Sequence, residues 1–283
     1  MNNIELTTKY LPLLDEVYKN EVKTSVLDGD EATIQKGQNG EIKVAKLDMD
    51  ALGDFSRNSG YTEGNTTLTW ETIKYDKERS QKLHIDRLDN EESLGVAVAK
   101  LSGEFLRTKV APETDAARIS KIVSVEGITK KEETITTGDE MYKALRAGTN
   151  DMDEKEVSTE NRILFITPTG KALVDDLETY KSKSVMSRFA QVIEVPRTRM
   201  YTAIDLNTGE ENYGYKKAEG AGDINFLIVE KSAVVTAMEQ YIKYFTPDQD
   251  QNGDSHVFPY RNYNLYGHVY ENKVAGVYCS YKA

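Results

Sequence analysis

Two long β-strand patterns separated by a polar segment constrain the fold of this chain most. The first covers residues 34–47 and the second residues 66–85, and both mix β-branched and aromatic side chains with charged ones, as strands do. The second pattern has about 20 residues and would be on the order of 65 Å long, whereas strands usually have about 5–6 residues. Residues 53–65, between the two, are polar and rich in turn formers.

A two-stranded ribbon of this kind is only marginally stable by itself in water, so it needs support from outside the pair. The pattern leaves two interpretations open. Either the segments are shorter strands of an ordinary sheet, or they form a projecting hairpin that rests on another copy of the chain.

Composition narrows the class of protein. The chain has 283 residues, of which 39% are hydrophobic and 29% charged, enough to bury a core as one large domain or two smaller ones. A net charge of −11 argues against binding nucleic acid by neutralising its phosphates. The single cysteine, Cys279, excludes an internal disulfide framework and indicates a reducing compartment. No transmembrane or signal-peptide pattern is present, so we expect no membrane association.

The N-terminal half is predicted to contain an arm and a long helix. Residues 1–31 have the pattern of an arm rather than a packed start, with a short amphipathic helix after Pro12. Residues 90–123 carry an apolar stripe after an Asp-Asn cap, which predicts a helical rod of roughly 50 Å. Pro112 should kink or interrupt this rod.

From about Val125 the pattern changes to α/β. The continuous apolar run at residues 162–166 is typical of a strand covered on both faces, and a helix carrying Leu173 and Val174 follows it. A second unit repeats this plan, with a strand at 224–229 and a helix carrying Val234, capped by Ser232. The remaining predicted elements are a helix at 139–147 and strands at 241–245, 257–270 and 274–281.

Two segments resemble ligand-binding loops without completing them. Residues 167–172 resemble a phosphate-binding loop, but Phe165 stands where its first glycine belongs and Ala172 where it needs Ser or Thr. The pattern therefore predicts an ordinary strand-to-helix turn capped by Thr169. Residues 248–254 resemble the start of a calcium loop, but its twelfth position is Pro259 rather than Glu. An acidic, solvated turn is the favoured interpretation, and weak cation binding stays open.

No arrangement of residues predicts catalysis, a metal or a cofactor. His84, His256 and His268 lie far apart in strand-like contexts, and Cys279 has no cysteine or histidine near it in sequence. The Gly-x-Ser-x-Gly motif of serine hydrolases is not in the sequence. We therefore expect a structural protein rather than an enzyme.

The order of these elements resembles the major capsid proteins of tailed bacteriophages. Residues 84–92 are similar to the junction between the extended loop and the spine helix of those proteins, and residues 109–122 to the end of that helix. Residues 224–234 resemble a strand and helix of their axial domain. Residues 246–250 and 260–263 resemble their peripheral-domain hairpin.

The resemblance implies an α+β chain with the capsid fold that tailed phages share with the herpesvirus shell floor and the encapsulins. It implies four parts: an N-terminal arm (1–31), an extended β-hairpin loop (32–86), a peripheral domain with the spine helix (87–124 and 240–270), and an α/β axial domain (125–239 and 271–283).

The resemblance also implies a function and partners. The chain would form pentamers and hexamers of an icosahedral shell that encloses double-stranded DNA without sequence-specific binding. It would need no cofactor, would assemble in the host bacterial cytoplasm with scaffolding and portal proteins, and would end in the virion. The extended loop would lie across a neighbouring subunit.

Candidate interface residues follow from that expectation. At least one of Trp70 and Tyr75 should be buried by a neighbour, and the charges at 77–79 should pair across the subunit boundary. Acidic loops that meet at a symmetry point would repel one another unless cations or basic residues intervene. The candidates are Tyr61, Trp70, Tyr75, Lys77, Glu78, Arg79, Asp248, Asp250 and Asp254.

Other classes of protein remain as alternatives. An encapsulin-like bacterial compartment would use the same fold around a protein cargo. A calcium-dependent surface-binding β protein would depend on the acidic loop, and a hydrolase on the α/β part would need a nucleophile that the sequence does not reveal.

Overall fold

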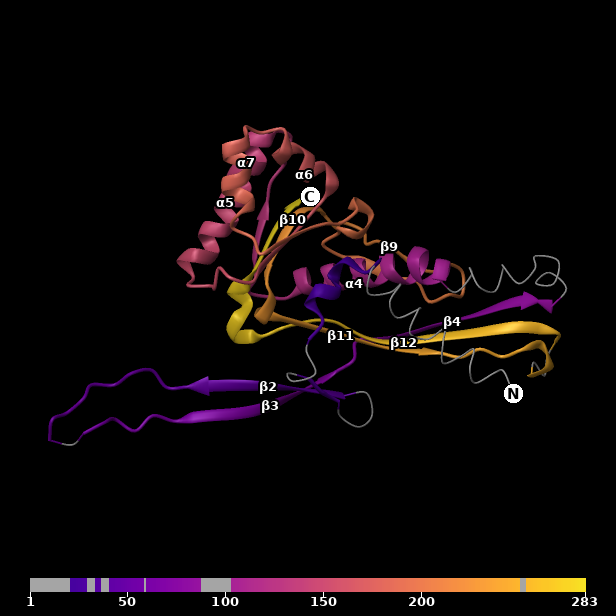
Figure 1. Cartoon of the computed structure of the whole chain (residues 1–283), viewed down its shortest axis with the longest axis horizontal. Coiled ribbons are helices and arrows are strands. Elements are labelled where there is room, and N and C mark those ends of the chain that lie inside the picture. Colours follow the sequence, from indigo (N-terminus) through magenta and orange to yellow (C-terminus); the bar gives the residue numbers. More distant parts are fainter. Residues whose placement is uncertain (1–20, 30–33, 37–40, 59, 88–102, 250–252) are drawn as a thin grey trace.

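The computed structural model is elongated, with an α/β lobe above a long sheet and a hairpin that projects to one side (Figure 1). It describes residues 21–29, 34–36, 41–58, 60–87, 103–249 and 253–283. The helix expected after Pro12 and the first part of the helix expected at 90–123 lie outside these residues. The helices and several separate sheets confirm the α+β class. No described helix is both long and apolar enough to cross a membrane.

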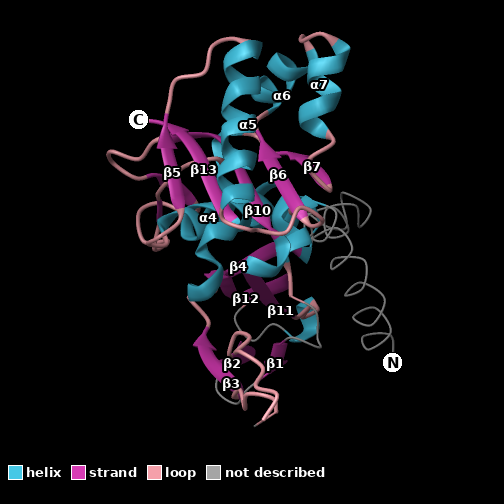
Figure 2. Ribbon diagram, turned by 90° about the vertical axis from the view of Figure 1, so that its left-hand side faces the viewer, coloured by secondary structure: helices cyan, strands magenta, loops and turns pink. Residues whose placement is uncertain are grey.

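A five-stranded sheet forms the core of the α/β lobe, in the order β5-β13-β10-β6-β7. The two apolar runs predicted to be strands form its central antiparallel pair, β6 (Arg162–Ile166) and β10 (Asp223–Glu230). All of β6 is buried, because α5 (Gly138–Glu154) and α6 (Pro168–Asp175) cover one face of the sheet and α4 (Ala111–Ser124) covers the other (Figure 2). The outer strands are β5 (Thr129–Glu132), β7 (Gln191–Glu194) and β13 (Val277–Lys282).

The helix predicted at 139–147 is longer than expected. It is α5 (Gly138–Glu154), and a capping box fixes its start. The hydroxyl of Thr137 accepts a hydrogen bond from the N–H of Glu140, and the Glu140 carboxylate accepts one from the N–H of Thr137.

The turn after β6 leads into two short helices, α6 (Pro168–Asp175) and α7 (Thr179–Met186). The prediction that Thr169 caps this helix is wrong, because the helix already begins at Pro168. Thr167 caps it instead: its Oγ1 accepts from the N–H of Gly170 at 3.2 Å. The sequence pattern did not predict α7.

Below the lobe lies a three-stranded antiparallel sheet in the order β11-β12-β4. The prediction of a helix carrying Val234 is wrong. The segment is the strand β11 (Val234–Ile242), and Val234 pairs with Val269. Its first three residues are β-branched and favour a strand once the chain is extended. The other strands are β12 (Ser255–Val269) and β4 (Lys77–Asp86). The strand expected from 274 begins only at Val277, because residues 271–276 form a 3₁₀ turn.

The single strand predicted at 66–85 is in fact two strands in two sheets. Its first part, β3 (Thr66–Lys74), pairs with β2 (Glu41–Met49) in the projecting hairpin, and β1 (Ile34–Lys36) adds to β2. Its second part, β4, pairs with β12. The break lies at Asp76, whose carboxylate accepts from the N–H of Tyr266 at 2.9 Å. One half of the ribbon thus belongs to an ordinary sheet and the other half to a projecting hairpin, and the contact of that hairpin with another copy stays a prediction.

The interruption of the long helix that was expected from Pro112 is present. A π-helical turn at Leu106–Val110 precedes α4 (Ala111–Ser124), with Pro112 in the first turn of α4. Because Pro112 has no N–H to donate, a widened turn there leaves no donor unsatisfied.

Residues 21–29, the described part of the segment expected as an arm (1–31), are packed. Residues 21–29 form a 3₁₀ turn at Lys23–Leu27, and Val22, Thr24 and Leu27 are buried. The described elements also include a small hairpin of β8 (Ile204–Leu206) and β9 (Tyr215–Lys217) and short 3₁₀ turns at Arg197–Arg199, Lys231–Ala233 and Pro247–Gln249. The division into four domains stays a prediction.

Candidate subunit interface

The projecting hairpin exposes most of the large apolar side chains found at the surface of the described residues. Of eleven such side chains, seven lie between residues 47 and 70: Leu47, Met49, Leu52, Phe55, Tyr61, Leu68 and Trp70. Soluble monomers rarely expose so many together, and such patches mark interaction sites. The hairpin is therefore the principal candidate interface, and it contains the predicted candidates Tyr61 and Trp70.

The described residues of the hairpin tip, 53–58 and 60–65, have local contacts of their own. Ser56 and Gly60 exchange two backbone hydrogen bonds of 3.2 and 2.7 Å, and Gly60 has a positive φ of 82°, which glycine adopts without strain. The rings of Phe55 and Tyr61 meet edge to face at 5.2 Å, although the two residues are 61% and 91% exposed. The tip thus presents an ordered aromatic pair to solvent.

The base of the hairpin is anchored on its own chain. Tyr75 is half-buried beside Tyr263, at 5.8 Å between ring centroids, and packs against Val235 and Leu265. Burial, followed by the charge of Glu239, raises the pKa of Tyr75. Tyr75 therefore contacts its own sheet, whereas Trp70, five residues earlier in the chain, remains 43% exposed.

Two of the three charges expected to pair across a subunit boundary are paired within the chain. Arg79 forms a bidentate ion pair with Glu113, at 2.7 Å from Nε, and this hydrogen bond raises the pKa of Arg79. Glu78 lies 3.0 Å from Arg261 on β12. Lys77, at the start of β4, is exposed.

The acidic loop is partly neutralised by its own chain. Arg87 Nη1 lies 3.6 Å from the carboxylates of both Asp248 and Asp254, all on exposed side chains. Asp250 lies outside the described residues. Among the residues that the structure describes, no cluster of three metal-ligating side chains occurs. The solvated turn therefore stays a prediction.

Two of the histidines contact neighbouring side chains, and the cysteine is packed in the core. His256 Nδ1 is 2.6 Å from the hydroxyl of Tyr244, and His268 Nε2 is 3.6 Å from Glu71. Cys279 is fully buried, and burial raises the pKa of its thiol to about 12. Because the thiolate is the reactive form, Cys279 is a packed residue rather than a nucleophile.

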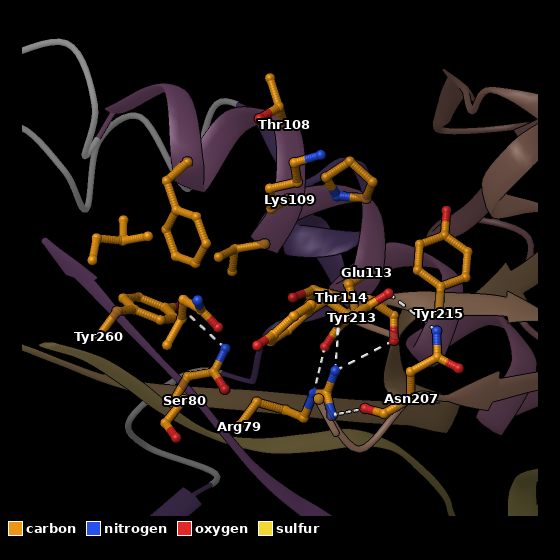
Figure 3. A pocket seen from close by; sticks show the side chains of 18 of the residues that line it. Arg79, Ser80, Thr108, Lys109, Glu113, Thr114, Asn207, Tyr213, Tyr215 and Tyr260 are labelled. Atoms are coloured by element: carbon orange, nitrogen blue, oxygen red, sulfur yellow. Dashed lines mark hydrogen bonds and ion pairs between the residues drawn. The ribbon is translucent and has the colours of Figure 1, made fainter. Parts of the chain in front are cut away.

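A groove of about 830 Å³ opens between β4, the π turn before α4 and the loop from β8 to β9 (Figure 3). Its lining includes Arg79 and Leu83 of β4, Tyr260 of β12, Phe105 and Lys109 of the helical segment before α4, and Tyr213 of the loop from β8 to β9. No sequence pattern indicates this groove, because its lining comes from segments far apart in the chain. Only Arg79 was a candidate.

Comparisons with known proteins identify the fold. No family model and no curated protein matches the sequence. The capsid structure of the cyanophage P-SCSP1u aligns with a TM-score of 0.58 and 16% identity, over 89% of this chain and 85% of that one. The mature capsid of bacteriophage PhiM1 aligns at 0.59 and 11%, over 88% and 83%. A virus-like particle from Pyrococcus furiosus aligns at 0.55 and 14%, over 96% and 99%.

This chain has the fold of tailed-phage major capsid proteins. The resemblance inferred from the order of sequence elements is thereby confirmed at the level of the fold.

A buried charge cluster ties the N-terminal segment to the rest of the capsid fold. Asp115 of α4 is fully buried and accepts hydrogen bonds from the N–H and hydroxyl of Thr24, at 2.9 and 2.7 Å. It also pairs with Arg199 at 2.8 Å. The buried Arg118, one α-helical turn along, pairs with Asp28 at 2.7 Å. Thr24 and Asp115 are 91 residues apart, so no sequence motif indicates this cluster.

Proposed function

We propose that the chain is the major capsid protein of a tailed phage. In this role it forms pentamers and hexamers, and these close an icosahedral shell around double-stranded DNA. The observation that carries the proposal is the capsid fold itself, which spans nearly the whole length of both this chain and the phage capsid chains.

The exposed hairpin supports the same role. Seven large apolar side chains exposed on a thin projection would promote aggregation of a monomer, and a neighbouring copy can cover them. A two-stranded ribbon gains stability when it rests on another surface. Self-assembly gives the hairpin that surface.

The charge of the chain fits a wall around DNA. A net charge of −11 disfavours tight adhesion to phosphates, so the shell confines the genome without sequence-specific binding. The scaffolding and portal proteins, assembly in the bacterial cytoplasm and final place in the virion belong to the same proposal. No catalytic step is assigned to the chain.

An encapsulin-like compartment is the second candidate. The alignment with the Pyrococcus furiosus virus-like particle over 96% of this chain is compatible with it, but the alignments with phage capsids do not favour it. The content of purified particles distinguishes the two: double-stranded DNA supports the phage coat, and a co-purified protein cargo supports the compartment.

Removal of the hairpin tip tests the proposed function. Deleting residues 53–65 joins Leu52 to Thr66 and leaves a three-residue loop between β2 and β3, a length that hairpins accept. We expect the subunit to keep its circular dichroism spectrum and thermal transition but to form no shells. Tyr180→Ser is the control, since Tyr180 is 83% exposed on α7 and away from the hairpin. Normal particles from the deletion variant would refute a role of the hairpin in assembly.

A further inference from the structure

A histidine of the three-stranded sheet faces a carboxylate at the base of the projecting hairpin. Nε2 of His268, near the end of β12, lies 3.6 Å from Oε2 of Glu71 on β3. We propose that these two side chains form a pH-dependent latch, which holds the hairpin in the direction seen in Figure 1 when His268 is protonated and releases it when His268 is neutral. The latch acts within one subunit, so the inference does not depend on the shell.

The hairpin starts from a fixed point at Asp76. The N–H of Asp76 donates a hydrogen bond to the carbonyl oxygen of Asn264 at 2.8 Å, and its carboxylate accepts one from the N–H of Tyr266 at 2.9 Å. The same carboxylate pairs with Nζ of Lys121 on α4 at 3.0 Å. Because Asp76 is held by both β12 and α4, the direction of the hairpin depends on contacts made between this point and the tip.

One side of β3 makes those contacts. Glu71 and Ile73 are partly buried, whereas the residues that alternate with them are exposed. Ile73 packs against the cluster of Val235 and Leu265, and Val235 is the residue opposite His268 on β11. Apolar packing does not change with pH, so the ionisable part of the contact is the pair of Glu71 and His268.

The imidazole is placed to respond to protonation. Its Nε2 atom is buried and has no hydrogen-bond partner among the residues that the structure describes. A buried nitrogen without a partner costs free energy. Protonated histidine donates from both ring nitrogens, so Nε2 could then donate to the Glu71 carboxylate. The Glu71 side chain is 39% exposed, which leaves it room to move closer.

The other titratable groups around the pair keep their charge state in this pH range. The Tyr270 ring meets His268 edge to face at 5.4 Å, and burial, followed by the charge of Glu71, raises the pKa of Tyr270. Burial is also the largest cause of the raised pKa of Tyr75, so both tyrosines stay neutral. Lys273 lies 5.6 Å from the centre of the Tyr270 ring and stays charged. Histidine is the side chain that commonly changes charge between pH 5 and 8.

The direction of the effect follows from the charges. A neighbouring carboxylate favours the protonated imidazole, so the latch is complete at the acidic end of this range and is lost as the pH rises. A partly exposed ion pair changes an equilibrium by up to about fivefold. We therefore expect the ratio of held to released hairpins to fall by up to about fivefold between pH 5.5 and pH 8.

A distance measurement on dispersed full-length subunits tests the latch. Spin labels on Asn58→Cys at the exposed tip and Tyr180→Cys on α7 report the direction of the hairpin by double electron–electron resonance. The native Cys279 is buried, so it should take no label. We expect a narrow distribution of distances at about pH 5.5 and a broader one at about pH 8.

Substitutions identify the groups responsible. His268→Gln and Glu71→Gln each remove one charge at similar size, so either should make the distribution independent of pH. His268→Lys keeps a cation beside Glu71 and should hold the hairpin at both pH values. His84→Gln is the matched control, because His84 is an exposed histidine on β4, and it should behave as the wild-type chain does.

Two results would overturn the latch. One is a wild-type distribution that is the same at both pH values, which needs no variant to fold. The other is a pH dependence that persists in His268→Gln or disappears in His84→Gln. Neither result bears on whether the chain forms shells, so the proposed function is judged separately from this inference.

Discussion

The carboxylate of Asp115 offers the sharpest test of how the N-terminal segment is held, through the substitution Asp115→Ala. The side chain is fully buried on α4 and accepts hydrogen bonds from the N–H groups of Lys23 and Thr24, at 3.2 and 2.9 Å, and from the Thr24 hydroxyl at 2.7 Å. It also neutralises Arg199, which is 2.8 Å away and largely buried. The substitution leaves all of these donors without an acceptor.

The cost follows from those contacts. Breaking a buried ion pair by removing one partner costs about 3–5 kcal/mol, and a buried unsatisfied donor about 1–3 kcal/mol. Because the two effects overlap at one site, we expect a loss of about 4 kcal/mol in the free energy of unfolding. Asp115→Asn keeps one oxygen acceptor, so it should lose about half as much. Domains are stable by only about 5–15 kcal/mol, so the loss is large.

Urea denaturation followed by circular dichroism, on dispersed subunits, measures the loss. The control is Asp205→Ala, since Asp205 is exposed and its ion pair with Lys216 at 3.9 Å should contribute less than about 1 kcal/mol. The double variant Asp115→Ala/Arg199→Met should be less destabilised than the sum of its parts, because no uncompensated cation remains. A loss below about 1 kcal/mol for Asp115→Ala would refute the reasoning.

Three further predictions each concern one residue of the chain. Trp70 is the only tryptophan and is 43% exposed, so its emission should move to shorter wavelengths on assembly if a neighbour covers the hairpin; an unchanged spectrum would contradict that. Cys279, with a thiol pKa of about 12, should react with a disulfide reagent at neutral pH only after unfolding, and fast labelling of the native chain would refute its burial. Hydrogen bonds from the backbone and hydroxyl of Thr136 hold the pKa of Glu140 near 2 instead of 4.5. Its contribution to stability is therefore complete above about pH 4.5 and is lost as the pH falls toward 2, and Glu140→Gln should show a flatter dependence of stability on pH in that window.

The elements that sequence reasoning predicted correctly have patterns that do not depend on distant contacts. The run at 162–166 is apolar throughout, which requires cover on both faces, and the structure covers both. Pro112 has no backbone N–H, so it cannot donate the hydrogen bond that continues a regular helix. This property belongs to the residue itself and needs no distant contact.

The errors arose where distant partners decide the local structure. Residues 234–238 are apolar at spacings that suit either a helix or a strand, and only the pairing with β12 selects the strand. Residues 66–85 have strand propensity throughout, but the change of partner from β2 to β12 divides them. The groove and the Asp115 cluster each join segments far apart in sequence, so no local signal indicates them.

Negative-stain electron microscopy of the purified full-length chain tests the central claim most directly. The account predicts closed shells, or rings of five and six subunits, because a hairpin with seven exposed apolar side chains needs a neighbouring copy. A field of uniform single subunits at high protein concentration, with and without a co-expressed scaffolding protein, would contradict it.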